Sequence, residues 1–177
     1  MLFPKDNLNR EGWDMAAGVT RTGTTGDDVL AGTAGDDTIT GLAGNDSLSG
    51  GDGNDSLTVA GYALVGIDGG DGDDTMVLEG TRIFASGGTG NDTVTIKRTD
   101  IDIARGGAGN DTITSSLGEE QIDGGVGDDV LTAIGGTVAG GAGDDVLTLS
   151  YGTAVGGAGR DRFVIGGLGN PDLGQDW

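Results

Sequence analysis

The sequence predicts an all-β fold, a right-handed solenoid in which two parallel sheets are stacked turn upon turn. The first observation is a nonapeptide that recurs ten times between residues 23 and 164. Its general form is Gly-Gly-x-Gly-x-Asp-x-U-x, where U is apolar; residues 50–58 read GGDGNDSLT and residues 106–114 read GGAGNDTIT. The second observation is that the spacers between the later copies keep an aliphatic residue in the register of U. A short period kept over many copies is typical of a β-solenoid.

Composition also separates the chain from ordinary globular domains. It has 177 residues, of which 40 are Gly, and a formal charge of −20. Such a charge opposes a compact fold by self-repulsion, so either disorder or a bound cation is expected. A disordered tract needs no strict period, whereas Gly and Asp here stay in phase over ten copies. We therefore expect disorder only in the metal-free chain.

Several kinds of site and signal are missing from the sequence. The absence of Cys excludes disulfides and thiolate metal sites, and the absence of His excludes zinc-protease helices and Ser-His-Asp triads. No apolar run is long enough for a membrane span, and Pro4, Lys5 and Asp6 interrupt the region where a signal peptide would be apolar. We expect a protein that is not an enzyme and that is exported without an N-terminal signal peptide.

The order of the copies defines the predicted turns. Their first residues are Gly23, Gly32, Gly41, Gly50, Gly69, Gly87, Gly106, Gly124, Gly140 and Gly156. The first four copies are contiguous, and from Gly50 onward the starts are 19, 18, 19, 18, 16 and 16 residues apart. Because two nonapeptides make eighteen residues, each turn is predicted to contain two half-turns, and the later copies recur about once per turn.

Each copy is predicted to end in a short strand with one inward apolar residue. These U residues are Leu30, Ile39, Leu48, Leu57, Met76, Val94, Ile113, Leu131, Leu147 and Phe163. The equivalent spacer positions, two residues before each later starting glycine, are Ile67, Ala85, Ala104, Ile122, Val138 and Ala154. An apolar residue between Thr, Ser or Val has the period of two of a strand. The spacers are therefore predicted to be half-turns that keep the inward residue and lose the Gly/Asp loop.

The loops are predicted to line two edges of the solenoid. Gly at positions 1 and 4 of every copy indicates positive φ or close backbone approach, and position 5 is Asp or Asn in nine copies, residues that tolerate left-handed backbone. The first edge is expected to carry the loops beginning at Gly32, Gly50, Gly69, Gly87, Gly106, Gly124, Gly140 and Gly156, and the second edge those beginning at Gly23 and Gly41. The shortest spacers, residues 133–139 and 149–155, are expected to make tighter turns at the second edge.

The Asp at position 6 is the candidate metal ligand. Calcium takes six to eight oxygen ligands from carboxylates and backbone carbonyls, and the Gly-rich loop offers both. The candidates are Asp28, Asp37, Asp46, Asp55, Asp74, Asp92, Asp111, Asp129, Asp145 and Asp161. One loop supplies too few oxygens, so each ion is expected between two stacked loops, which allows about eight ions and a residual charge of about −4. The alternative is that these Asp residues serve only as turn formers.

The array resembles the RTX (haemolysin-type) calcium-binding nonapeptide-repeat family. That resemblance implies a parallel β-roll with calcium between stacked loops, secretion by a type I system and folding triggered by extracellular calcium. The first three copies depart from the pattern at position 2, which is Thr24, Thr33 and Leu42, so weaker binding is expected there. In the last copy Arg160 replaces the usual Asp or Asn, and further on Pro171 stands where a ligand Asp would be.

Three segments follow from this reading. Residues 23–165 are predicted to form the β-roll. Residues 1–22 match no repeat and are interpreted as an N-terminal cap, with Trp13 and Met15 over the first turn, or as a disordered remnant. Residues 166–177 are interpreted as a degenerate repeat or a frayed tail.

The predicted function is that of a calcium-binding module of a secreted protein, and two other functions remain open. The chain also resembles the accessory modules of alginate epimerases, which implies binding of an anionic polysaccharide; the candidate residues Arg82, Lys97, Arg98 and Arg105 could form one basic strip on a sheet. An adhesin-like or ice-binding face would use the outward residues Thr40, Ser49, Thr58, Thr95, Thr114, Thr132 and Thr148, although Val77 and Val164 interrupt them. Nucleic acid is not an expected partner, because carboxylates surround the loops and would repel phosphate.

Overall fold

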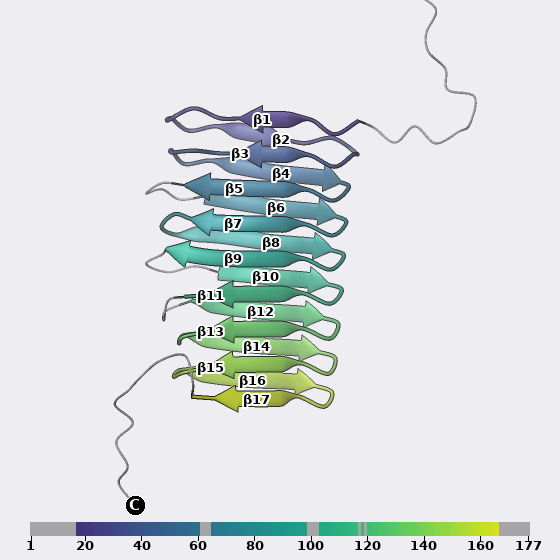
Figure 1. The fold of residues 1–177 in the computed structure, drawn as a ribbon, viewed down its shortest axis with the longest axis vertical. Helices are drawn as coiled ribbons and strands as arrows, with labels where there is room; N and C mark the ends of the chain where they lie inside the picture. Colours follow the sequence, from purple (N-terminus) through teal and green to yellow (C-terminus); the bar gives the residue numbers. More distant parts are fainter. Residues whose placement is uncertain (1–16, 61–64, 99–102, 117, 119, 167–177) are drawn as a thin grey trace, which may run out of the picture.

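The computed structural model describes residues 17–60, 65–98, 103–116, 118 and 120–166, and these form an elongated solenoid of two parallel sheets (Figure 1). The predicted all-β class and the parallel β-roll are confirmed. The chain alternates between the sheets, so that odd-numbered strands lie in one and even-numbered strands in the other. No helix occurs among the described residues, and hence none that is long and apolar enough to cross a membrane.

The first sheet has nine strands, each paired in parallel with the strand one turn away. These strands are β1 (Thr20–Thr22), β3 (Thr38–Thr40), β5 (Ser56–Ala60), β7 (Thr75–Glu79), β9 (Thr93–Arg98), β11 (Thr112–Ser115), β13 (Val130–Ala133), β15 (Val146–Leu149) and β17 (Arg162–Ile165). The strand β1 precedes residue 23, where the sequence places the start of the roll. The first turn therefore begins on a segment that matches no repeat.

The second sheet has eight strands and runs in the opposite direction across the solenoid (Figure 1). These strands are β2 (Val29–Ala31), β4 (Ser47–Asp52), β6 (Val65–Asp71), β8 (Ile83–Thr89), β10 (Ile103–Ala108), β12 (Gln121–Val126), β14 (Thr137–Ala142) and β16 (Thr153–Ala158). Loops that lead from this sheet into the nine-stranded sheet form the first edge, and loops in the reverse sense form the second edge.

A single apolar core fills the space between the sheets. In the nine-stranded sheet the U residues from Ile39 to Phe163 pair turn by turn, and in the other sheet Leu48 is followed by Ile67, Ala85, Ala104, Ile122 and Val138 in the same register. Nearly all of these side chains are buried. The spacers are thus half-turns that keep the inward residue, as their register predicts, because burial of one aliphatic face fixes the pairing of each strand.

The turns of the solenoid differ in length at the second edge. Residues 134–136 and 150–152 form three-residue turns there, with positive φ at Gly136 and Gly152, as the shortened spacers predict. Residues 80–82 make a turn of the same length, in which Arg82 adopts a φ of 62°. From the loop beginning at Gly50 onward, the loops of the first edge keep their form while turns of 16 to 19 residues stack in register.

Candidate calcium sites

The structure gathers the position-6 Asp residues into two columns. Eight of them lie one above another along the first edge: Asp37, Asp55, Asp74, Asp92, Asp111, Asp129, Asp145 and Asp161. Asp28 and Asp46 stack in the same way on the second edge. The alternation of a strand explains the placement, because Asp at position 6 lies two residues before the inward residue U and therefore points inward as well. Eight of the ten carboxylates are buried.

One oxygen of each stacked carboxylate holds neighbouring turns together. In the first-edge column from Asp55 onward, Oδ1 accepts a hydrogen bond from the main-chain N–H of the position-6 Asp one turn earlier. The Asp55 N–H donates to Asp74 Oδ1 at 2.7 Å, and the Asp92 N–H donates to Asp111 Oδ1 at 2.8 Å. This oxygen is therefore committed to the fold itself.

The second oxygen has no such partner. Among the described residues, the Oδ2 atoms of Asp46, Asp55, Asp74, Asp92, Asp111, Asp129 and Asp145 are buried and accept no hydrogen bond. A buried carboxylate oxygen without a donor costs several kcal/mol, on the order of the penalty for an unpaired buried ion. A repeated set of such atoms indicates that something positive belongs beside them.

On the first edge, the carbonyl oxygen of the next loop lies beside each of these carboxylates. A Cβ on Gly69 would overlap both Asp74 Oδ2 of the same loop and the Gly87 carbonyl oxygen of the next loop. A Cβ on Gly23 would lie 2.8 Å from both Asp28 Oδ2 and the Gly41 carbonyl oxygen. The same arrangement surrounds Gly32, Gly50, Gly87, Gly106, Gly124 and Gly140. Position 1 is therefore glycine because a side chain would fill the space where carboxylate and carbonyl oxygens converge.

The last Gly/Asp loop on each edge differs, because no further copy of the repeat follows it on that edge. Near Gly156, the start of the last first-edge loop, the three nearest atoms all belong to Asp161 and none is a carbonyl oxygen of another loop. Near Gly41 on the second edge the Asp46 carboxylate is the nearest group, and residues 61–64 of the following turn lie outside the described part of the chain. Carboxylate and carbonyl thus meet at eight pairs of loops, seven on the first edge and one on the second.

Burial has a strong effect on the acidity of the first-edge column. Loss of solvation, opposed by one backbone hydrogen bond and reinforced by neighbouring carboxylates, raises the pKa of Asp74 and of Asp111 to about 7. The same causes raise the pKa of Asp129 to about 6, and burial also raises the pKa values of Asp55 and Asp92. A carboxylate whose charge is disfavoured in this way gains most from a cation placed beside it.

These groups suit calcium by their chemistry. Calcium prefers oxygen ligands and accepts a flexible arrangement of carboxylates and carbonyls. No group of three or more Asp, Glu, His or Cys side chains comes together among the described residues. Backbone carbonyls would therefore have to supply most of the ligands, and the glycine-rich loops bring carbonyls to the carboxylates.

The glycine at position 4 of the repeat has the positive φ that its residue type predicts, whereas the residue at position 5 does not have a positive φ. From the third copy onward the glycine at position 4 has a φ of 115° to 139°. The only described non-glycine residues with positive φ are Leu42 and Arg82, so Asp and Asn at position 5 do not adopt the left-handed conformation that their type tolerates.

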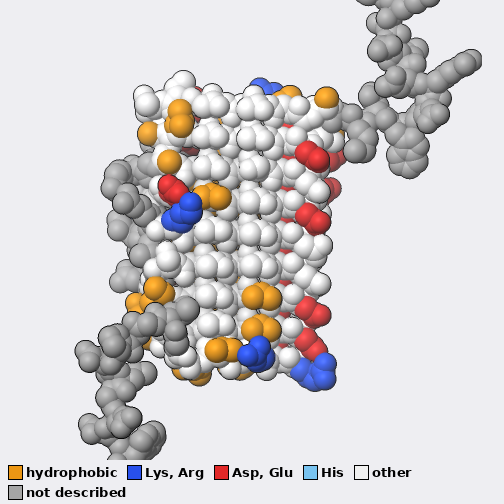
Figure 2. Space-filling model, viewed as in Figure 1, with side chains coloured by type: hydrophobic (Ala, Val, Ile, Leu, Met, Phe, Trp, Pro, Cys, Tyr) orange, Lys and Arg blue, Asp and Glu red, His pale blue; other side chains and the backbone are white. Residues whose placement is uncertain are grey.

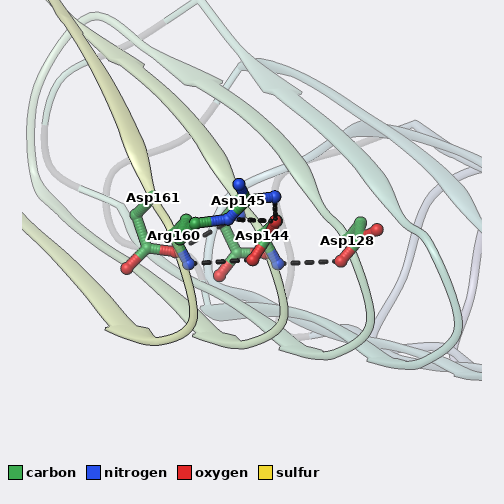
Figure 3. Close-up of polar contacts among 5 residues, drawn as sticks. All are labelled: Asp128, Asp144, Asp145, Arg160 and Asp161. Atoms are coloured by element: carbon green, nitrogen blue, oxygen red, sulfur yellow. Dashed lines mark hydrogen bonds and ion pairs between the residues drawn. The ribbon is translucent and has the colours of Figure 1, made fainter.

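Position 5 instead forms an exposed ladder along the first edge. Asp128 Oδ1 accepts the N–H of Asp144, and Asp144 Oδ1 accepts the N–H of Arg160 (Figure 3). The Arg160 guanidinium also forms an ion pair with Asp144 at 2.6 Å. The requirement at this position is a side-chain oxygen that can accept a main-chain hydrogen bond. Acidic side chains are visible along this edge of the molecule (Figure 2).

One further buried acid was not identified from the sequence. Glu120 immediately precedes β12 on the second edge, is 1% exposed, and neither of its carboxylate oxygens has a hydrogen-bond partner among the described residues. The residue type of Glu120 does not mark it as a buried residue in the sequence, because the spacers carry no repeat motif with which it could be aligned. The inward register of the residue, two before Ile122, is the sequence feature that could have identified it.

The four candidate basic residues do not form one strip on a sheet, so that expectation is wrong. Lys97 and Arg98 lie in β9 of the nine-stranded sheet, Arg105 lies in β10 of the other sheet, and Arg82 lies in a second-edge turn. The reason is that each spacer begins in the nine-stranded sheet, turns at the second edge and ends in the eight-stranded sheet, so residues of one spacer are divided between the two sheets. Lys97 also forms an ion pair with Glu79 at 2.7 Å.

The outward Thr residues do align on the nine-stranded sheet. Thr40, Thr58, Thr95, Thr114, Thr132 and Thr148 share one register, which Val77 and Val164 interrupt. Ser49 lies in β4 of the other sheet and is not part of this column.

The stacked Gly/Asp loops define the class of protein to which this chain belongs, a β-solenoid whose repeats bind calcium. A family model, the RTX calcium-binding nonapeptide repeat, matches residues 22–57, 67–80, 99–131 and 136–152 with four copies. The chain is a member of this RTX family, as its sequence predicts. No curated protein and no solved structure matches the chain.

Proposed function

We propose that this chain is a calcium-binding folding module of a secreted protein. The observation that carries the proposal is the set of six buried, unpartnered Oδ2 atoms on the first edge, those of Asp55, Asp74, Asp92, Asp111, Asp129 and Asp145, each of which lies beside the carbonyl oxygen of the next loop. With calcium bound, a positive charge would lie between successive turns and offset both the buried carboxylates and the net charge of −20.

The proposed ligands are the position-6 carboxylates together with the position-1 carbonyls of the following loops. The carboxylates are those of Asp28, Asp37, Asp46, Asp55, Asp74, Asp92, Asp111, Asp129, Asp145 and Asp161. Eight loop pairs bring the two kinds of oxygen together, which sets an upper bound of about eight ions under this pairing.

Binding and folding are coupled in this proposal. Without calcium, the stacked carboxylates repel one another, so the chain stays extended and suits export in an unfolded state through a type I system. Outside the cell, calcium would bind only to the stacked loops and would therefore shift the equilibrium toward the folded form. The role is structural rather than catalytic, because the position-6 carboxylates are committed to the ladder of turns.

The experiment that tests the proposal is a calcium titration of the chelator-treated chain followed by far-UV circular dichroism. We expect a cooperative transition from coil to β structure with calcium and none with magnesium, because magnesium keeps its waters and demands strict octahedral geometry. An unchanged spectrum at saturating calcium would contradict the proposal.

The alternative functions have less support. The basic residues proposed for an anionic polysaccharide are divided between two sheets and a turn. An ice-binding or adhesive face would need an unbroken column, whereas valines interrupt the Thr column and the strand position accounts for Thr by itself.

A further inference from the structure

The first loop on each edge is closed, in the sense that a Thr of the loop donates hydrogen bonds to the position-6 carboxylate of the same loop. These loops begin at Gly23 on the second edge and at Gly32 on the first. The N–H and the hydroxyl of Thr24 donate to Asp28 Oδ2 at 2.6 and 3.0 Å. In the next loop the Thr33 N–H donates to Asp37 Oδ2, and the Thr33 hydroxyl lies 3.2 Å from the same oxygen. Neither Oδ2 belongs to the unpartnered set.

The other carboxylate oxygen of Asp37 is satisfied as well. Asp37 Oδ1 accepts the main-chain N–H of Val19, and the Thr33 hydroxyl lies 3.1 Å away. Both oxygens of this buried side chain are therefore occupied by hydrogen-bond donors of the protein. A carboxylate in this state gains little from a cation, because its desolvation is already offset.

The backbone of these two loops also differs from that of the others. The Thr hydroxyl accepts the N–H of the glycine two residues on, Gly26 at 3.1 Å and Gly35 at 3.4 Å. Neither of these glycines has the positive φ that the position-4 glycine has in all eight later copies. A Thr turn of this kind satisfies its own donors and acceptors, so it needs no ion to hold its shape.

The third copy separates the effect of the hydroxyl from that of a missing glycine. It also departs from Gly at position 2, where Leu42 adopts a φ of 66°. Leucine has no hydroxyl, and Asp46 Oδ2 remains buried with no hydrogen-bond partner among the residues that the structure describes. The closure of the first two loops therefore follows from Thr and not from the loss of Gly.

We propose that Thr24 and Thr33 close the first loop on each edge without calcium, so that the chain binds six ions rather than eight. The inference rests on the proposed function, since it concerns which loops take the ion. The six remaining sites are those whose carboxylate is unpartnered and faces a carbonyl of the next loop: Asp55, Asp74, Asp92, Asp111, Asp129 and Asp145. The N-terminal end of the solenoid is then held by hydrogen bonds, and the calcium ladder is built upon it.

Native mass spectrometry of the full chain at saturating calcium counts the ions directly. We expect six for the unmodified chain, seven for Thr33→Gly, seven for Thr24→Gly and eight for the double variant. Thr33→Ser keeps the hydroxyl and should keep six. Thr25→Gly and Ala34→Gly introduce glycine at position 3 of the same loops and should also keep six. Far-UV circular dichroism in calcium checks that each variant is folded.

The outcomes separate this inference from the proposed function. Eight ions on the unmodified chain would overturn the inference and leave the proposed function intact, and this count requires no variant to fold. Six ions on a folded Thr33→Gly chain would show that Thr is not the cause and would overturn it too. No bound ion on the unmodified chain would overturn both.

Discussion

The replacement of Gly106 by Ala tests whether position 1 lines an ion site. Gly106 is a buried residue of β10 and the first residue of the copy whose loop leads into β11. A Cβ there would lie 2.5 Å from the Gly124 carbonyl oxygen and still closer to Asp111 Oδ2. Neither atom can move freely, because the Asp92 N–H holds the carboxylate at its other oxygen and Gly124 belongs to β12.

Two costs are expected, and only one depends on calcium. Overpacking by the methyl group should cost ~1–3 kcal/mol whether or not calcium is present. Loss of one ion should cost a further ~2.7 kcal/mol when free calcium exceeds the site's Kd about a hundredfold. The free energy of unfolding should therefore fall by ~4–6 kcal/mol in calcium.

The assay combines an ion count by native mass spectrometry with chemical denaturation at several calcium concentrations. Gly66→Ala is the matched control, since Gly66 lies in β6 and a Cβ there meets no atom within 4 Å. We expect Gly106→Ala to bind one ion fewer and to show a shallower gain in stability with added calcium. An unchanged ion count with the stability of the control would refute the account of position 1.

Two further predictions concern charge. The raised pKa values of Asp74, Asp111 and Asp129 mean that the folded metal-free chain binds protons more tightly than the unfolded chain, so its stability is lost as pH rises through about 6 to 7. Acidification from about pH 7.5 to about pH 5 should therefore increase the β signal of the chelated chain in far-UV circular dichroism, and a loss of signal would contradict this. Glu120→Gln should raise the free energy of unfolding in calcium by ~1–3 kcal/mol, because it removes a buried carboxylate whose oxygens have no hydrogen-bond partner in the described part of the chain. Asp123→Asn, at an exposed position three residues further along, removes the same charge and should have little effect in the same denaturation experiment.

The strand register could be predicted from the sequence because one physical requirement determines it. Each half-turn must bury one aliphatic residue, and the spacing of Ile67, Ala85 and Ile122 from the starting glycines is enough to identify these residues. The same spacing predicts which loops share an edge. The strand β1 could not be predicted in this way, because it places Arg21 in register with Ile39 at the end of the sheet.

The details of the loops could not be predicted as well from the sequence, because they depend on hydrogen bonds between turns. The sequence identifies Asp at position 6 but not that its two oxygens have different roles. Nor does it indicate that the Asp and Asn side chains at position 5 accept hydrogen bonds from the next turn, since the same residue types also suit left-handed backbone. In the sequence, the Thr residues at position 2 are only departures from the repeat motif. Their hydrogen bonds to the position-6 carboxylates become evident only in the structure.

The variable turns of the second edge have a consequence for the tolerance of this molecule to insertion. Turn lengths change there by as many as three residues, yet the glycine and aspartate columns of the opposite edge remain aligned. Exposed turns with few constraints are where foreign segments are best accepted. A peptide grafted after Tyr151, which lies in the turn of residues 150–152 and is 60% exposed, should thus be displayed at one level of the solenoid without disturbing the ladder. The scaffold could in this way carry several different loops at a regular spacing of about 4.8 Å per turn.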